Sequence, residues 1–117
     1  MPKERDAERE GGRNRSDAPL FEQMTIIGVG LIGGSLARAA RRAGLVSRFV
    51  GAGRRVENLE KALALGVIDR FEVDRLAAVK GSDLVVICTP VHAQLKVVEA
   101  ILPALDDGTV VTDVGSV

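Results

Sequence analysis

Three glycines near the start of the apolar part of the chain have a spacing that suits phosphate binding. Gly28, Gly30 and Gly33 fit the pattern G-x-G-x-x-G, between an apolar, β-branched run and a helical pattern. In this order the first glycine permits a tight turn, the second leaves room for a pyrophosphate, and the third lets the helix pack on the strand. The free N–H groups and the positive dipole end of the helix would face the phosphates. The motif residues expected at a dinucleotide site are Gly28, Gly30, Leu31, Ile32 and Gly33. The alternative is a glycine turn with a purely structural role.

The run Gly53-Arg54-Arg55 is a second candidate feature for cofactor recognition. It follows an apolar stretch, about 20 residues beyond the glycines, where a fold that prefers NAD usually places Asp or Glu to bind the ribose 2′-hydroxyl. Gly53 offers no carboxylate, and an arginine can pair bidentately with a 2′-phosphate. We therefore expect NADP as the cofactor, with NAD as the alternative. The expectation fails if Arg54 and Arg55 only begin a solvated helix.

The composition is that of one packed globular domain. The chain has 117 residues, of which 46% are hydrophobic and only 3% aromatic, so its core must be aliphatic. Sixteen basic residues balance sixteen acidic ones, which leaves no overall field that would attract nucleic acid or an anionic membrane. The single cysteine, Cys88, excludes an internal disulfide. No apolar run approaches the ~20 residues of a membrane span or resembles a signal segment, so we expect a cytoplasmic protein. No His, Cys, Asp or Glu cluster has metal-ligand spacing, so no metal site is expected.

Residues 1–19 differ from the rest of the chain. They are almost all charged residues, Gly, Ser and Asn, with no periodic apolar positions. Such a segment cannot bury enough apolar surface to offset the entropy lost on ordering, which predicts a disordered tail. Its basic and acidic residues alternate, so a nucleic-acid-binding arm is not expected. We assign residues 20–117 to one dinucleotide-binding domain.

Strands and helices are expected to alternate through that domain. The predicted strands are Thr25–Val29, Arg48–Ala52, a short one near Val67–Asp69, Asp83–Thr89 and Thr109–Val114. The predicted helices are Leu31–Ala43, Val56–Leu65, a turn near Leu76–Val79, and Val91–Leu102. This alternation predicts an α/β fold of the Rossmann type, with a doubly wound, mainly parallel sheet. The sequence ends just past the fifth or so strand, so we expect the domain to be incomplete at its C-terminus.

Helical periodicity predicts which faces are buried. The inward-facing residues expected on the three longer helices are Ile32, Leu36, Ala39, Ala40 and Ala43, then Leu59, Ala62 and Leu63, then Leu95, Val98, Ile101 and Leu102. Glu57 and Lys61 stand at i, i+4, which predicts an ion pair on the surface of the second helix.

Three segments of the chain are distinctive when taken together: IIGVGLIGGSLA (Ile26–Ala37), CTPV (Cys88–Val91) and TDVGSV (Thr112–Val117). They resemble the nucleotide-binding half of prephenate and arogenate dehydrogenases, the oxidoreductases of tyrosine biosynthesis. The resemblance runs from about Met24 to Val117. It implies oxidative decarboxylation of a small-molecule substrate, prephenate or arogenate, with hydride transfer to a nicotinamide cofactor. It also implies that the full-length protein is a homodimer.

The resemblance further implies roles for individual residues. Those that would contact the pyrophosphate region are Gly28, Gly30, Gly33 and Ser35. Thr89 and Pro90 would line the cofactor at the next strand end. Ser116 would sit beside the nicotinamide and the ring hydroxyl of the substrate; its alternative role is that of a helix N-cap.

The family's catalytic histidine and substrate-clamping arginines lie in a segment beyond the one that this sequence matches. His92, the only histidine, follows Thr-Pro-Val at a helix start and is expected to be partly exposed rather than a catalytic base. Cys88 is expected to be an inert core residue, and Asp83 and Asp113 to make turn or cap hydrogen bonds. The chain alone is therefore expected to bind cofactor without turnover. The alternative function is a stand-alone, non-catalytic NADP(H)-binding or sensing module.

Overall fold

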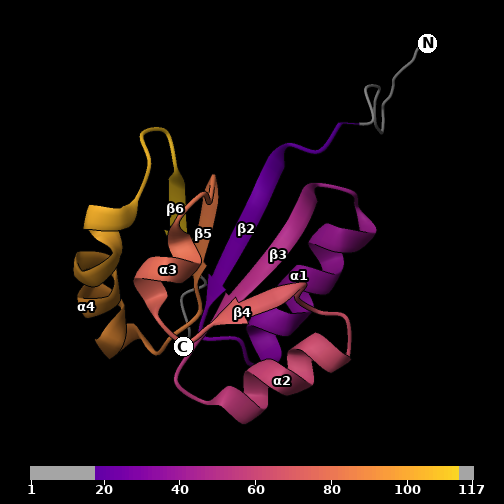
Figure 1. Cartoon of the computed structure of the whole chain (residues 1–117), viewed down its shortest axis with the longest axis horizontal. Helices are drawn as coiled ribbons and strands as arrows, with labels where there is room; N and C mark the ends of the chain where they lie inside the picture. Colours follow the sequence, from indigo (N-terminus) through magenta and orange to yellow (C-terminus); the bar gives the residue numbers. More distant parts are fainter. Residues whose placement is uncertain (1–17, 114–117) are drawn as a thin grey trace.

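The computed structural model describes residues 18–113, apart from the side chains of Leu31, Ile32 and Val91. Figure 1 shows how strands and helices alternate along this part of the chain. The strands are β2 (Phe21–Ile27), β3 (Val46–Ala52), β4 (Arg70–Glu72), β5 (Leu84–Ile87) and β6 (Val110–Asp113). The helices are α1 (Leu31–Arg42), α2 (Val56–Ala64), α3 (Arg75–Val79), α4 (Val91–Ile101) and the 3₁₀ turn η2 (Leu102–Ala104). The tail predicted for residues 1–19 falls, as far as residue 17, outside the described part.

The strands form one parallel sheet with the order β4-β3-β2-β5-β6. From β2 the chain builds outward to β3 and β4, and then returns to place β5 on the other side of β2. The direction of winding therefore reverses between β2 and β5, which is the switch point at which open α/β sheets bind ligands. This topology confirms the predicted α/β fold with a doubly wound, Rossmann-type sheet.

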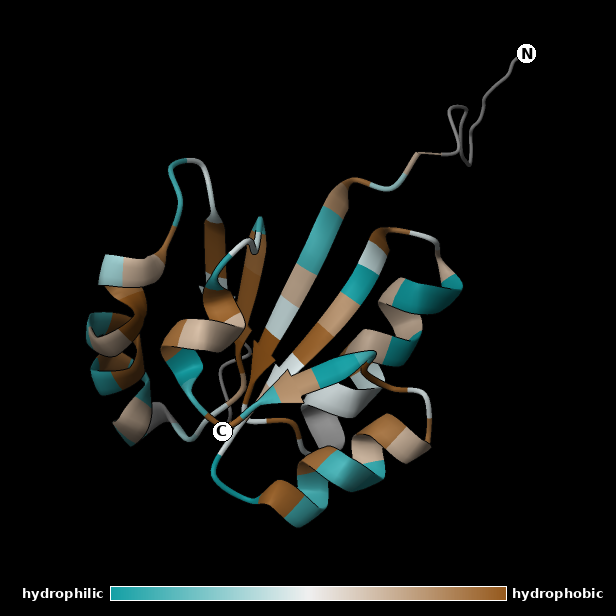
Figure 2. Cartoon of the chain, in the orientation of Figure 1, coloured by the Kyte–Doolittle hydropathy of each residue, from teal (hydrophilic) through white to brown (hydrophobic). Residues whose placement is uncertain are grey.

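Helices cover both faces of the sheet, with α1 and α2 on one side and α3 and α4 on the other (Figure 1). The buried cluster under α1 and α2 includes Met24, Ile26, Ala37, Phe49 and Ala62. The cluster under α3 and α4 includes Ile27, Val50, Ala78, Val85, Val97 and Ile101. Figure 2 shows β5 apolar along its length, as expected for a parallel strand buried on both faces. Within residues 18–113 no helix is long and apolar enough to cross a membrane.

The short strand predicted near Val67–Asp69 is misplaced, because β4 begins only at Arg70. Val67 and Ile68 are buried, but they fill the first cluster from a loop. The carboxylate of Asp69 accepts a hydrogen bond from the backbone N–H of Phe49 at 2.8 Å, which fixes that loop against β3. The apolar signal therefore marked a buried loop, which hydropathy alone cannot distinguish from a strand.

The face of α1 that meets the sheet is only partly the predicted one: Leu36 and Ala40 pack against the first cluster, as expected. Gly33 and Ala37, one turn apart, are buried, whereas Ala39 and Ala43 are exposed. The smallest residues face the sheet because they let the helix approach it closely. The helix bounds agree with the prediction to within a residue.

Two other predicted helix faces are partly wrong. In α4, Val97 and Ile101 pack on the core, while Leu95 and Leu102 are 69% and 57% exposed. In α2, Leu63 is 42% exposed, although Leu59 and Ala62 are buried as predicted. An aliphatic helix carries apolar residues on more than one side, so its periodicity does not decide which side meets the sheet.

Asp83 stabilises the edge of the sheet at which the strands begin. Its carboxylate accepts hydrogen bonds from the backbone N–H groups of Glu22 and Gln23, both at 2.8 Å. Burial on its own would raise the pKa of Asp83, but these donors and the charge of Arg48 outweigh it and hold the pKa below the ordinary 3.8. Asp83 therefore has the structural role predicted for it, although its partners lie on the neighbouring strand rather than in its own turn.

Candidate dinucleotide-binding site

The central strands end level with one another at the edge of the sheet that carries the glycine motif. Ile27 of β2 pairs in register with Ala52 of β3 and with Ile87 of β5. Beyond this level the N–H of Gly28 donates to the carbonyl of Ala52 at 2.8 Å, and the N–H of Cys88 donates to that of Ile27 at 2.8 Å. The structure thereby brings three predicted segments to one edge: the glycine loop, Gly53 with its arginines, and Thr89 with Pro90.

Gly28 makes the sharp turn between β2 and α1. Its φ is +87°, a conformation that side chains rarely tolerate. A Cβ at this position would lie 3.0 Å from Thr89 Cγ2 and 3.2 Å from the Thr89 backbone nitrogen. Both the turn and its packing against the residue after β5 require glycine. This agrees with the prediction that Gly28 permits the tight turn.

Gly33 and Gly30 meet very different surroundings. A Cβ on Gly33 would lie 3.1 Å from Ile26 Cγ2, so the glycine lets α1 approach β2, as predicted. A Cβ on Gly30 would meet no described heavy atom within 4 Å. Gly30 therefore borders open space at the point where the motif would admit a phosphate.

The N-terminus of α1 has no side-chain cap. Gly30 occupies the N-cap position without a side-chain hydrogen bond, and the first turn carries no acidic residue. The first N–H groups of an α-helix have no partner within the helix, so they can bind a ligand. Ser35 is exposed, one turn into the helix.

Thr89 carries a buried hydroxyl for which the described part of the chain offers no hydrogen-bond partner. It follows the end of β5 and packs on Gly28 through its methyl group. Its carbonyl accepts a hydrogen bond from Gln94 Nε2 at 3.1 Å, which holds the turn into α4, and Pro90 occupies the N-cap position of that helix. A buried hydroxyl without a partner costs free energy, so Thr89 suits a site where a ligand supplies the missing partner.

The segment after β3 carries positive charge and no carboxylate at the strand end. Arg54 and Arg55 are exposed, and Arg55 occupies the N-cap position of α2. Neither side chain makes a hydrogen bond or ion pair with a described residue, so both are free to meet a ligand. Gly53 is half-buried, and a Cβ there would meet only Leu59 Cδ2, at 3.9 Å, so the position has room for a side chain.

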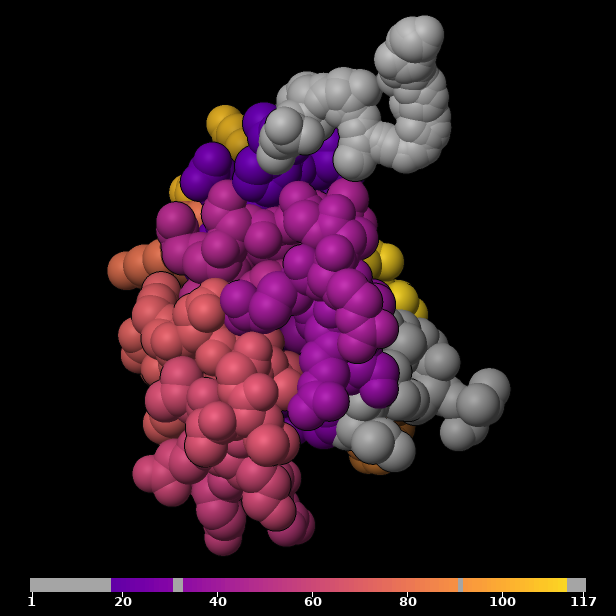
Figure 3. Space-filling model, turned by 90° about the vertical axis from the view of Figure 1, so that its right-hand side faces the viewer, coloured from indigo at the N-terminus to yellow at the C-terminus, as the bar shows by residue number. Residues whose placement is uncertain are grey.

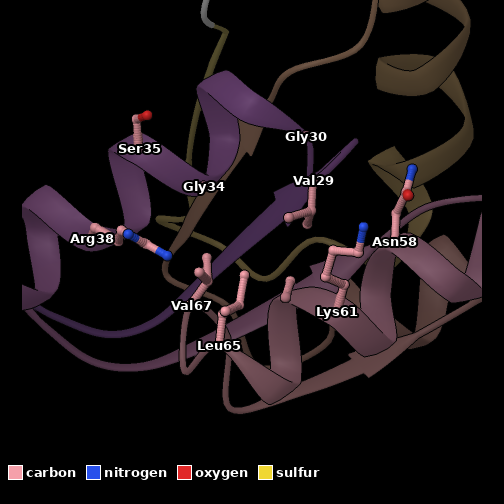
Figure 4. Close-up of a pocket in the computed structure, with 10 residues that line it drawn as sticks. Val29, Gly30, Gly34, Ser35, Arg38, Asn58, Lys61, Leu65 and Val67 are labelled. Carbon is pink, nitrogen blue, oxygen red and sulfur yellow. The ribbon is translucent and has the colours of Figure 1, made fainter.

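A cavity of about 520 Å³ between α1 and α2 was not foreseen in the sequence. Both helices lie on the face of the molecule turned to the viewer in Figure 3, and the cavity begins beside Gly30. Its lining includes Arg38 from α1 and Asn58, Lys61 and Leu65 from α2 (Figure 4). Sequence periodicity gave only one signal for it, namely basic residues on the outward sides of both helices.

The remaining candidates have no catalytic geometry in the described part of the chain. His92 is exposed on the first turn of α4, as predicted, and no described residue hydrogen-bonds its ring. Cys88 follows β5 directly and is half-buried, and burial raises the pKa of its thiol, in line with an inert residue. Ser116 lies outside the described residues. Among residues 18–113 no three His, Cys, Asp or Glu side chains gather as metal ligands would.

Comparison with known proteins points to one enzyme family. The family model for "Prephenate dehydrogenase, nucleotide-binding domain" matches residues 36–117. Cyclohexadienyl dehydrogenase of Zymomonas mobilis is 37% identical over 100 residues, which cover 84% of this chain and 33% of that protein.

Two solved structures have the same fold. Prephenate dehydrogenase of Aquifex aeolicus, in complex with hydroxyphenyl propionate and NAD+, aligns with a TM-score of 0.75 and 30% identity over 82% of this chain and 34% of that one. Synechocystis arogenate dehydrogenase aligns with a TM-score of 0.74 and 33% identity, over 81% and 33% of the two chains. The chain thus spans about a third of the length of these relatives. Because the family model covers most of the sequence, the chain belongs to the family of prephenate dehydrogenase nucleotide-binding domains.

Proposed function

We propose that this chain is the cofactor-binding part of an enzyme that oxidises and decarboxylates prephenate or arogenate, with NADP as the hydride acceptor. Membership of the family supports the reaction class. The two ligands of the Aquifex aeolicus complex, NAD+ and hydroxyphenyl propionate, support a nicotinamide dinucleotide and a substrate with a six-membered ring.

The observations that carry the proposal lie on one edge of the sheet: open space beside Gly30, and the buried, unsatisfied hydroxyl of Thr89, which packs on Gly28 of the same glycine loop. A pyrophosphate at Gly30 would accept hydrogen bonds from the free N–H groups of α1 and lie at the positive end of its dipole. A polar group of the same ligand would satisfy Thr89. The room beside Gly30 and the unmet hydrogen bonds at this edge therefore support a dinucleotide site.

The chain's own residues have binding and orienting roles in this proposal. We assign cofactor binding to Gly28, Gly30, Leu31, Ile32, Gly33, Ser35, Gly53, Arg54, Arg55, Thr89 and Pro90. Ser116 is proposed to contact the substrate hydroxyl and the nicotinamide. When bound, the nicotinamide supplies the acceptor for the hydride, while CO2 leaves the substrate and its ring becomes aromatic.

The preference for NADP over NAD rests on the end of β3. No carboxylate is present at Gly53 to accept hydrogen bonds from a ribose 2′-hydroxyl, and Arg54 and Arg55 are exposed and unpaired among the described residues. A guanidinium can donate two parallel hydrogen bonds to a phosphate, so a 2′-phosphate gains contacts that NAD cannot make.

Titration of the ¹⁵N-labelled chain with NADP tests the proposal. We expect the amide signals of Gly28, Gly30 and Thr89 to shift together and to saturate. Signals from α3, on the opposite face of the sheet, should stay in place. Saturable shifts elsewhere, with none at the glycine loop, would contradict this site.

A further inference from the structure

The cavity between α1 and α2 has neither Thr89 nor Gly53 in its lining. It begins beside Gly30 and continues along the two helices as far as Arg38 and Leu65. Its volume of about 520 Å³ lies in the range of small-molecule sites. Gly30 and Ser35, which are assigned above to the cofactor, line one end of this space. Arg38 and Lys61 have no role in that assignment.

The charged residues that line the cavity are all positive. Arg38 comes from α1 and Lys61 from α2, and among the described residues no Asp or Glu lines the cavity. Figure 4 shows their charged groups directed toward the space between the two helices. The cavity therefore has a cationic rim built from two separate elements.

Both cations lack an acidic partner among residues 18–113, although acids are near in sequence. Lys61 was expected to pair with Glu57, but the two form no ion pair, and Lys61 reaches over the cavity instead. Two other basic residues of the domain do find acids: Arg41 lies 3.1 Å from Asp69, and Arg70 lies 2.7 Å from Glu72. The charges of Arg38 and Lys61 thus stay available to a ligand in the cavity.

The floor of the cavity is apolar. Ala62 and Val67 contribute to it and are buried, while Leu65, which is 61% exposed, lies at its margin. An apolar floor below a cationic rim suits an organic anion that buries its body and presents its charge to the rim.

We propose that this cavity binds a phosphate group carried on a small organic molecule, with Arg38 and Lys61 as its cationic ligands. Phosphate fits better than a single carboxylate because it carries up to two charges and more acceptor oxygens, which two cations from different helices can share. The ligand is a phosphorylated molecule separate from the dinucleotide, whose 2′-phosphate is assigned above to Arg54 and Arg55. Because the cavity starts at Gly30, the test also asks whether a bound dinucleotide fills it. The site itself follows from the cavity and its charges and does not depend on the proposed reaction.

Amide-shift titrations of the full 117-residue chain, at constant ionic strength, test the site. The probes are adenosine 2′-monophosphate, inorganic phosphate and, as the uncharged control, adenosine. We expect saturable shifts at Gly34, Lys61 and Leu65 with both phosphates and none with adenosine. Arg38→Gln and Lys61→Gln should each weaken binding about tenfold, the loss expected for one charge-assisted contact. Arg42→Gln is the matched control, because Arg42 is exposed one turn further along α1 and does not line the cavity. No saturable shifts in the cavity, or equal weakening by all three variants, would overturn the proposal.

A repeat of the titration with saturating NADP identifies the source of the phosphate. If the cavity amides still respond to inorganic phosphate, the site holds a separate ligand, as proposed. If they no longer respond, the cavity belongs to the dinucleotide site, and the proposal of a separate ligand is overturned. The amides of Gly28 and Thr89 report dinucleotide binding independently, so loss of the cavity site with intact shifts there would overturn this inference and leave the proposed function standing.

Discussion

Gly28, in the turn after β2, packs directly against Thr89, which follows the end of β5. A Cβ on Gly28 would lie 3.0 Å from Thr89 Cγ2, and the glycine has a φ of +87°. The methyl group of Thr89 thus packs on the glycine turn, while its hydroxyl is buried without a partner among the described residues. The contact joins the fold to the proposed cofactor site.

Gly28→Ala should therefore destabilise the fold itself. The positive φ and the contact with the Thr89 backbone leave no room for a methyl group, and strain of this kind costs ~1–3 kcal/mol. We expect a lower midpoint in urea unfolding and weaker dinucleotide binding. An unfolding midpoint equal to that of the unchanged chain would show that the turn can relax.

Gly30→Ala should weaken cofactor binding without destabilising the fold. Its Cβ would meet no described atom within 4 Å, and its φ of −141° is open to alanine. We expect an unchanged free energy of unfolding and a loss of affinity for the cofactor, because the methyl group would occupy the space proposed for the pyrophosphate. Calorimetric titration beside urea unfolding separates the two effects. Full affinity in this variant would place the pyrophosphate elsewhere.

The cofactor preference can be shifted at the end of β3. Arg54→Ala should weaken NADP and leave NAD nearly unchanged. Since a charge-assisted hydrogen bond contributes ~1.5–3 kcal/mol and ~1.4 kcal/mol is tenfold, NADP should bind about 10- to 100-fold tighter than NAD in the unchanged chain. Screening by salt would bring the ratio toward the lower figure.

Gly53→Asp is the complementary variant. A Cβ at Gly53 would have its nearest neighbour, Leu59 Cδ2, at an ordinary contact distance of 3.9 Å. The backbone there is not in the left-handed region, so an aspartate side chain fits. Its carboxylate would repel a 2′-phosphate and accept hydrogen bonds from a ribose, which should move preference toward NAD. Calorimetry with both cofactors at one ionic strength decides the matter; equal affinities in the unchanged chain would mean that the arginines point into solvent.

The sequence predicted the fold and the glycine loop because both depend on local rules. The order of strands and helices, and a glycine with positive φ between β2 and α1, follow from residue types and spacing. The exposure of Leu95 and the burial of Val97 do not, because they depend on how α4 rotates against a sheet whose shape is set by distant residues. Lys61 is a similar case: a helical ion pair with Glu57 is worth only a few tenths of a kcal/mol, so tertiary surroundings decide its position.

Stability should fall in acid through Asp83. The pKa of this carboxyl is lower in the folded chain than its ordinary value of 3.8, so the unfolded chain binds the proton more tightly. The stabilisation is complete above about pH 5 and is lost as the pH falls below 3.8 through the folded-state value. Asp83→Asn should flatten this part of the stability profile and cost ~1–3 kcal/mol near neutral pH, because it weakens the bonds to Glu22 and Gln23.

Asp107→Asn is the control for that experiment, since the Asp107 side chain is exposed and makes no hydrogen bond with a described residue. Urea unfolding between about pH 2 and pH 7 supplies the profiles. If Asp83→Asn kept the same acid dependence as the unchanged chain, other carboxyl groups would be responsible for it.

The 117-residue chain should bind cofactor without oxidising prephenate or arogenate. A positioned general base contributes typically ~10²–10⁴-fold to a rate, and His92, the only histidine, is exposed on α4 with no described residue to orient it. A turnover assay that follows NADPH absorbance should stay at background. Activity that disappears in His92→Ala would show that this residue is a catalytic base after all.

The outer edge of β6 should make the chain self-associate. Within residues 18–113, β6 is the outermost strand on that side of the sheet, and Val110 and Val111 are 49% and 36% exposed. An edge strand offers unpaired backbone groups to another chain, and exposed valines add apolar surface to the contact. Sedimentation velocity should show species larger than a monomer that increase with concentration. Val110→Lys should shift the distribution toward monomer, because a charge on an edge strand opposes pairing. Leu63→Lys, at a similarly exposed apolar residue of α2, should not. A monomer at every concentration, or an equal response to both lysines, would mean that β6 does not drive association.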